Sequence, residues 1–159
     1  MERLKQMLIR HEGYKKKPYR CTRGKMTIGV GWNMEANDLP RDIASCLRVC
    51  GHITDEMVHR LLDISIETAT NHCRSIYQGF DNYSENRRFA LIDFIFNVGV
   101  GTALKFKNMK RAIEEGRWRD AAHEVMESAY WAQLGGDPPG ADDGILERPE
   151  EIARMIEGG

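Results

Sequence analysis

The segment from residue 11 to residue 33 constrains the fold of this chain more than any other stretch. It is preceded by residues that recur at the spacing of an amphipathic helix: Leu4, Met7, Leu8 and His11. Gly13 is a natural stop for that helix. Turn residues then divide the next stretch into two short strands, 17–20 and 26–28, joined by a turn at 22–25. The sequence therefore predicts a helix that leads directly into a small β-hairpin.

Three side chains with useful chemistry lie in this segment: Glu12, Cys21 and Thr27. Eight residues separate the first two, and five separate the last two. A carboxylate at a helix end would face a hairpin that carries a thiol and a hydroxyl. This arrangement predicts a cleft with reactive groups on one wall.

The pattern E-G-x5-Y-x-C-x5-T-I-G-x-G closely resembles the phage-type lysozymes, a family of endolysin muramidases. Members of that family carry Glu, then Asp or Cys after eight residues, then Thr after five more, which here fall on Glu12, Cys21 and Thr27. The resemblance continues in order along nearly the whole chain, through residues 87–99, 106–109, 117–122, 128–133 and 148–156.

The resemblance implies an α+β, lysozyme-like, two-lobed fold in one catalytic domain, residues 1–159. A small α+β lobe (about 13–60) carries the hairpin, and residues 1–12 join 80–159 in an all-helical lobe. A long helix, about 54–77, would link the two lobes. Thr54 is a suitable N-cap for it, and apolar residues keep helical spacing as far as Tyr77.

Other elements are predicted from local signals. Leu39-Pro40 begins a helix of about ten residues with Ile43, Leu47 and Cys50 on its inner face, and Gly51 ends it. Asn82 and Glu85 form a capping box before a core helix at 87–98. Further helices are expected at about 105–115, 117–127 and 149–156, with Trp118 in the core and 135–144 as an inserted loop.

Composition limits the classes of protein that this chain can belong to. The chain has 159 residues, 42% of them hydrophobic, and no apolar run long enough to cross a bilayer, so we expect no stable membrane association. Because a chain of this length shows no exposed heptad pattern, we also expect a monomer. Its N-terminal residues lack a signal core, which predicts accumulation in the cytoplasm of the cell that makes it.

Charge is unevenly distributed along the chain. Residues 1–26 hold nine Lys or Arg against two Glu, and residues 137–159 hold seven acids against two Arg. The basic segment favours an anionic polymer as partner, although single lysines are also consistent with a solvated face. No recognition pattern supports nucleic acid.

The four cysteines do not resemble a disulfide framework, because nothing in the sequence exports the protein. Cys46, Cys50, His52 and Cys73 have the wrong spacing for a common zinc site. Cys46, Cys50 and Cys73 are therefore expected to be buried and reduced, and no metal or organic cofactor is implied.

Glycoside hydrolysis needs an acid for the leaving oxygen and a positioned nucleophile on the other face of the sugar. Glu12 suits the acid if burial keeps it protonated, and Thr27 can hold an attacking water. Cys21 departs from the commoner Asp. Basic neighbours (Arg20, Arg23, Lys25) either favour its thiolate, or the thiol aids Thr27 as a neutral group. A thiolate nucleophile would give retention of configuration, whereas the resemblance favours direct water attack and inversion.

Three further residues are candidates for substrate binding. Asp93 and Asn97 are one helical turn apart in an otherwise apolar helix, and the family uses the Asn97 position to contact the sugar chain; the alternative is that they cap or solvate one side. Trp32 either packs in the core or stacks on a sugar ring, and packing is the simpler interpretation.

The resulting interpretation is an endolysin that hydrolyses the β-1,4 bond between N-acetylmuramic acid and N-acetylglucosamine of bacterial peptidoglycan. It would reach the periplasm and cell wall at lysis through a separate pore-forming protein. A lytic transglycosylase is one alternative, in which Glu12 acts alone. A wall-binding module that has lost catalysis is another, since Cys21 in place of Asp is what a decaying site would show.

Overall fold

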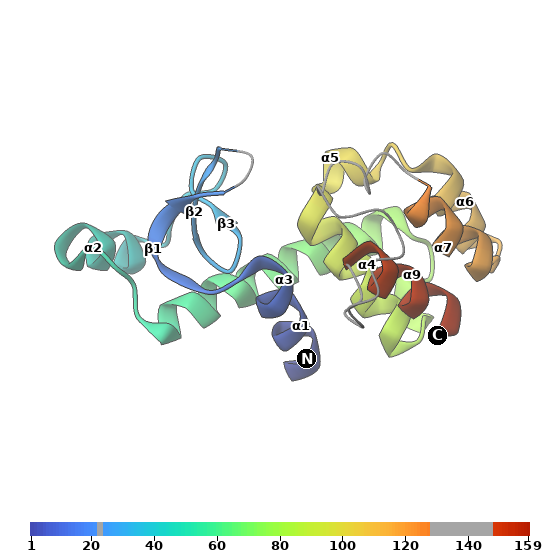
Figure 1. Cartoon of the computed structure of the whole chain (residues 1–159), viewed down its shortest axis with the longest axis horizontal. Helices are drawn as coiled ribbons and strands as arrows, with labels where there is room; N and C mark the ends of the chain where they lie inside the picture. The colour runs from blue at the N-terminus through green and yellow to red at the C-terminus, as the bar shows by residue number, and fades with distance from the viewer. Residues whose placement is uncertain (22–23, 128–147) are drawn as a thin grey trace, which may run out of the picture. The chain divides into compact units, whose positions relative to one another are not determined.

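The computed structural model describes residues 1–21, 24–127 and 148–159. The chain divides into two compact units, Met1–Glu67 and Thr68–Gly159. The first unit holds a three-stranded antiparallel sheet and helices, and the described part of the second is helical, so the predicted α+β lysozyme-like class is confirmed (Figure 1).

Helix α1 spans Glu2–Glu12 and ends as the sequence predicts. Gly13 adopts a positive φ of 79°, and its N–H donates to the carbonyl of Ile9 at 2.9 Å. A residue with a side chain would be strained in that conformation. Glu12 is consequently fixed at the point where the helix stops and the sheet begins.

The sheet has the order β1-β2-β3, with strands Lys15–Arg20, Met26–Gly29 and Trp32–Asn33. The predicted hairpin is confirmed as β1 and β2. The third strand was not predicted. Strand β3 follows β2 after only two residues, and Gly31 takes a positive φ of 73° in that connection.

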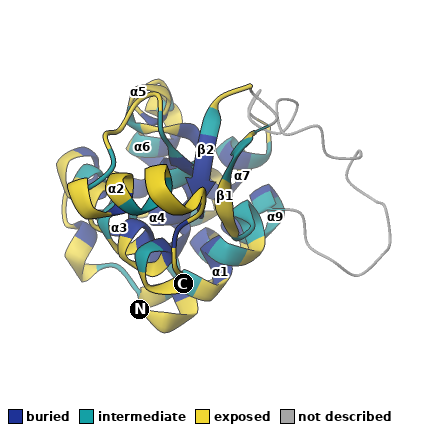
Figure 2. Ribbon diagram, turned by 90° about the vertical axis from the view of Figure 1, so that its left-hand side faces the viewer, coloured by how far each residue is buried: buried dark blue, intermediate teal, exposed yellow. Residues whose placement is uncertain are grey.

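The central strand provides the apolar side of the sheet. β2 is almost wholly buried, whereas most of β1 is exposed, as the burial colours of Figure 2 show. A Cβ added to Gly29 would lie 3.8 Å from side-chain atoms of both Val58 and Leu61, so β2 lies close against helix α3 (Asp55–Ile76). The N–H of Ile53 also donates to the carbonyl of Lys16 at 2.9 Å, which ties β1 to the start of that helix.

Helix α2 spans Arg41–Cys50, and Gly51 ends it in the left-handed conformation, as predicted. The sequence predicted more buried residues on this helix than the structure has. Only Ile43 is buried, Leu47 is half-buried and Cys50 is exposed. The helix therefore packs against the rest of the unit mainly through Ile43, and Cys50 in its last turn is exposed to solvent.

Helix α3 spans Asp55–Ile76 and begins at the predicted cap, because the hydroxyl of Thr54 accepts the N–H of Met57 at 3.2 Å. The boundary between the two compact units falls inside this helix, between Glu67 and Thr68.

The second unit continues with the short 3-10 helix η1 (Phe80–Asn82) and helix α4 (Glu85–Val98). The predicted capping box is wrong. Asn82 belongs to the 3-10 turn, and Ser84 is the N-cap, its hydroxyl accepting the N–H of Arg87 at 3.3 Å. Helix α4 itself is buried on nearly every side, as its composition predicts.

The remaining described helices are α5 (Val100–Ala103), α6 (Lys107–Glu114), α7 (Trp118–Met126) and α9 (Arg148–Gly158). Helix α9 packs against both α4 and α7 (Figure 1). The short α5 was not predicted. The blocks at 128–133 and 135–144 lie outside the described residues.

The sequence predicted Trp118 in the core. This prediction is wrong, because Trp118 is only half-buried. It stands at the start of α7, whose buried face is formed by Ala121, Ala122 and Val125. The edge of its ring meets Tyr83 at 5.0 Å between centroids, and the guanidinium of Arg87 lies 4.0 Å from its centroid. Trp118 therefore covers a cation at the rim of the unit.

Within residues 1–21, 24–127 and 148–159, no helix has both the length and the hydropathy that a bilayer crossing requires.

We expect Ser84→Ala to lower the free energy of unfolding by about 1 kcal/mol, since the Arg87 N–H at the start of α4 loses its acceptor. Urea unfolding followed by circular dichroism measures this. Asn82→Ala, two residues earlier and exposed, is the matched control and should change stability by less than about 0.5 kcal/mol. If Asn82→Ala lowers the free energy of unfolding more than Ser84→Ala does, the capping box predicted from sequence is correct after all.

Candidate active site

Cys21 and Thr27 are joined through one backbone atom. The carbonyl oxygen of Lys25 accepts the N–H of Cys21 at 3.0 Å and the hydroxyl of Thr27 at 3.1 Å. The carbonyl of Cys21 in turn accepts the N–H of Gly24 at 2.8 Å. The thiol-bearing residue and the hydroxyl-bearing residue are therefore held in a fixed relation at the end of the hairpin where its two strands are joined.

Thr27 lies in the middle of the sheet and is only 4% exposed. Its Cα pairs with Tyr19 on β1 and with Asn33 on β3. Its hydroxyl proton is donated to the carbonyl of Lys25, so its oxygen can take part in further hydrogen bonds only as an acceptor. Thr27 is thus arranged to accept a hydrogen bond from a water molecule.

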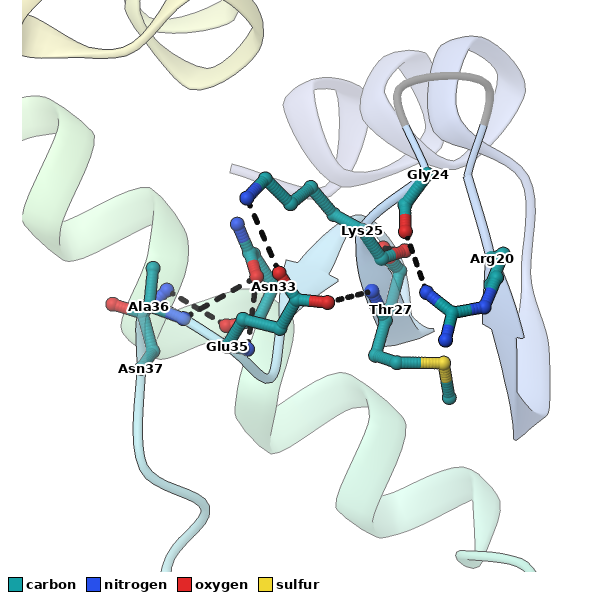
Figure 3. A network of polar contacts seen from close by, with 9 residues as sticks. Arg20, Gly24, Lys25, Thr27, Asn33, Glu35, Ala36 and Asn37 are labelled. Atoms are coloured by element: carbon teal, nitrogen blue, oxygen red, sulfur yellow. Dashed lines mark hydrogen bonds and ion pairs between the residues drawn. The ribbon is translucent and has the colours of Figure 1, made fainter.

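A polar network on the neighbouring chain segment supports this geometry (Figure 3). Glu35 accepts the N–H of Met26 at 3.1 Å and pairs with the ammonium of Lys25 at 3.2 Å. The side chain of Asn33 accepts the N–H groups of Glu35 at 2.9 Å and Ala36 at 3.3 Å. The bond from Met26, and then the Lys25 ammonium, hold the pKa of Glu35 below its ordinary value.

Two of the three basic neighbours proposed to act on Cys21 have other partners. Lys25 pairs with Glu35, and the guanidinium of Arg20 donates to the carbonyl of Gly24 at 2.8 Å (Figure 3). Arg23 lies outside the described residues. The ionisation state of Cys21, which is half-buried and forms no disulfide, stays a prediction from sequence.

Tyr19 is a fixed letter of the motif but was not among the predicted site residues. Burial raises the pKa of Tyr19, and the negative charges of Glu12 and Cys21 raise it further. Glu12 and Cys21 are therefore both within electrostatic reach of one phenol. Strand alternation was the available signal, since residues 19 and 21 share a face of an extended chain.

Trp32 is 8% exposed, and its indole Nε1 has no hydrogen-bond partner among the described residues. This burial agrees with the packing interpretation. Stacking on a sugar stays a prediction.

Asp93 and Asn97 lie in the other compact unit. Asp93 is fully buried, and its carboxylate pairs with the guanidinium of Arg148 on α9 at 2.5 Å. The ion pair gives Asp93 a structural partner, and its contact with substrate stays a prediction. Asn97 is half-buried, and its Oδ1 is a buried acceptor that meets no donor among the described residues.

The expectation of three buried cysteines is correct only for Cys73, whose pKa burial raises to about 12. Cys46 is half-buried and Cys50 is exposed, because α2 turns that side toward solvent. Partial burial, and then the neighbouring Cys50 thiol, raise the pKa of Cys46. In the described ranges, no three side chains of the His, Cys, Asp and Glu types gather where they could hold a metal ion.

Comparison with known proteins identifies the family. A family model described as Phage lysozyme matches residues 9–150, most of the chain. The Probable T4-type lysozyme 1 of Dictyostelium discoideum is 30% identical over an alignment of 145 residues that covers 80% of this chain and 84% of that protein. The chain belongs to the phage lysozyme family, and it is a lysozyme-type hydrolase that acts on peptidoglycan.

Two further relatives agree with this assignment. Probable T4-type lysozyme 2 of the same organism is 27% identical over 146 residues, covering 82% of this chain and 85% of its own length. The Pre-baseplate central spike protein Gp5 of Enterobacteria phage T4 is also 27% identical over 146 residues, 82% of this chain but 25% of that larger protein.

We expect Asp93→Ala to destabilise the second unit by about 3–5 kcal/mol, because it removes the buried carboxylate that pairs with the guanidinium of Arg148. Urea unfolding checks this value. The double variant Asp93→Leu/Arg148→Met removes both charges and should recover most of the loss. If Asp93→Ala costs less than about 1 kcal/mol, the ion pair is not a structural requirement.

Proposed function

We propose that this chain is an endolysin that hydrolyses the β-1,4 bond between N-acetylmuramic acid and N-acetylglucosamine. The observation that carries the proposal is the Lys25 carbonyl, which takes the N–H of Cys21 and the hydroxyl of Thr27 together. Such a pair suits a reaction in which one group holds a water molecule and its neighbour removes the proton.

Glu12 is the general acid in this proposal. It is half-buried at the end of α1, where Gly13 fixes the backbone, and its charge acts on the same tyrosine as that of Cys21. Its protonated carboxyl gives a proton to the glycosidic oxygen as the bond to the anomeric carbon breaks.

Thr27 and Cys21 prepare the water. One O–H of the water donates to Thr27 Oγ1, whose own proton is committed to Lys25. The other proton passes to the thiolate of Cys21 while the water oxygen bonds to the anomeric carbon, on the face opposite the leaving group. Attack from that face inverts the configuration, so the new reducing end is the α-anomer.

Three further residues are proposed to contribute to substrate binding: Asn97, Trp32 and Asp93. Asn97 offers a buried acceptor that a sugar hydroxyl or amide N–H can satisfy. Trp32 and Asp93 are proposed to support the site by packing and by the Arg148 ion pair, since each is almost wholly buried. The basic N-terminal residues would raise the local concentration of an anionic wall polymer.

As an endolysin, the protein would be made inside the infected bacterium and reach the cell wall through a separate pore-forming protein. Host lysis and antimicrobial activity follow from that proposal.

We expect Glu12→Gln and Cys21→Ser to lower kcat about 10²- to 10⁴-fold, because each removes a proton-transfer group. Cys21→Asp should keep most activity, since it restores the commoner carboxylate of the family. The assay is release of reducing ends from purified, outer-membrane-stripped Gram-negative walls, in reductant. Glu2→Gln, at the exposed first turn of α1, is the matched control and should act like wild type.

Product masses distinguish the alternatives. A hydrolase adds water to each cleaved bond, whereas a transglycosylase gives an anhydro sugar. A fully active Cys21→Ser variant would exclude the thiolate base. Wall binding without any released product would identify a binding module instead.

We further expect peroxide to inactivate the enzyme and reductant to restore it, because the working thiolate oxidises to a sulfenic acid or a disulfide. The variant Cys46→Ser/Cys50→Ser removes the other accessible thiols and should remain sensitive. Cys21→Asp in that background should resist peroxide. Equal sensitivity with and without Cys21 would contradict the assignment.

A further inference from the structure

The hydroxyl of Tyr19 is a hydrogen-bond donor without an assigned task. Among the described residues it donates to no acceptor, in contrast to Tyr14, whose hydroxyl bonds to Asp55 at 2.7 Å. Tyr19 is half-buried, so its ring is fixed against the protein while its polar end stays reachable.

The register of the sheet places Tyr19 beside the proposed machinery. Its Cα pairs with that of Thr27 across β1 and β2, so the two side chains stand on one face of the sheet. Cys21 follows two residues later and is bonded to the same Lys25 carbonyl as Thr27. One short segment thus brings the phenol, the thiol and the hydroxyl to one place.

The electrostatics agree with that placement. The negative charges of Glu12 and Cys21 both raise the pKa of Tyr19, in addition to burial. Because the pKa of Tyr19 is raised above the ordinary value for a phenol, the hydroxyl keeps its proton near neutral pH and remains a donor. A neutral phenol is a hydrogen-bond donor, and a donor that bonds to the charged form of an acid favours that form.

We propose that Tyr19 is a positioning residue whose hydroxyl donates a hydrogen bond to the anionic forms of Glu12 and Cys21 during the reaction. This assignment rests on the proposed function for its role in turnover. The bond forms as the substrate complex tightens the site and as charge develops on these groups. The phenol neither gains nor loses its proton.

The test compares Tyr19→Phe with Tyr14→Phe, which loses an equivalent hydroxyl outside the site. We expect Tyr19→Phe to lower kcat about ten- to hundredfold, the range for a lost hydrogen bond to a charged group, with KM within about twofold. Its pH profile of kcat/KM should move to higher pH, because Glu12 and Cys21 both hold their protons more tightly without the donor. Tyr14→Phe should match wild type in both respects.

A purely structural role predicts something different. It would lower activity without moving the pH profile, and that result would overturn the assignment, as would a Tyr19→Phe variant with wild-type kcat and profile. If Tyr19→Phe does not fold, 3-fluorotyrosine introduced at position 19 keeps the shape of the ring. This more acidic donor should move the profile to lower pH, and an unmoved profile overturns the proposal.

A second measurement does not depend on turnover. In the Cys46→Ser/Cys50→Ser background, with Cys73 buried, the rate of alkylation by iodoacetamide against pH reports on Cys21. Tyr19→Phe should shift this curve to higher pH, and coincident curves would overturn the coupling. If the wild type releases no reducing ends, the proposed function fails, and this titration still decides whether Tyr19 acts on Cys21.

Discussion

One carbonyl group, that of Lys25, determines how this site is built. A carbonyl oxygen has two lone pairs, and here one takes a backbone N–H and the other a side-chain hydroxyl. The first bond closes the end of the hairpin at Cys21, and the second fixes the rotamer of Thr27. The bond that closes the hairpin and the bond that orients the Thr27 hydroxyl therefore have the same acceptor, so neither can shift without disturbing the other.

Much of the fold was predictable because its signals are local. Gly13 and Gly51 end helices where the sequence predicts, and Thr54 begins α3 through a bond to a residue three positions away. The prediction was wrong where two local signals compete. Asn82 and Ser84 both suit a helix start, and the 3-10 turn at Phe80–Asn82 decides between them.

The candidate site divides in the same way. Glu12, Cys21 and Thr27 stand out by residue type and spacing, although their roles remain proposals. Tyr19 shows only the weaker signal of strand alternation, and its proposed role depends on the residue opposite it on the next strand. The partner of Asp93 lies fifty-five positions away at Arg148, and no periodicity in the sequence indicates such a pair. This ion pair could be predicted only if the packing of α9 on α4 were already known.

The register of β1 with β2 also has a consequence for the order of folding. Glu12, Tyr19, Cys21 and Thr27 span only sixteen consecutive residues, so closing the chain around them costs little conformational entropy. Contacts of such short sequence separation form quickly, whereas the pairing of Asp93 with Arg148 must wait for the end of the chain. The reactive groups are thus expected to come together early in folding, before the core of the second unit has formed.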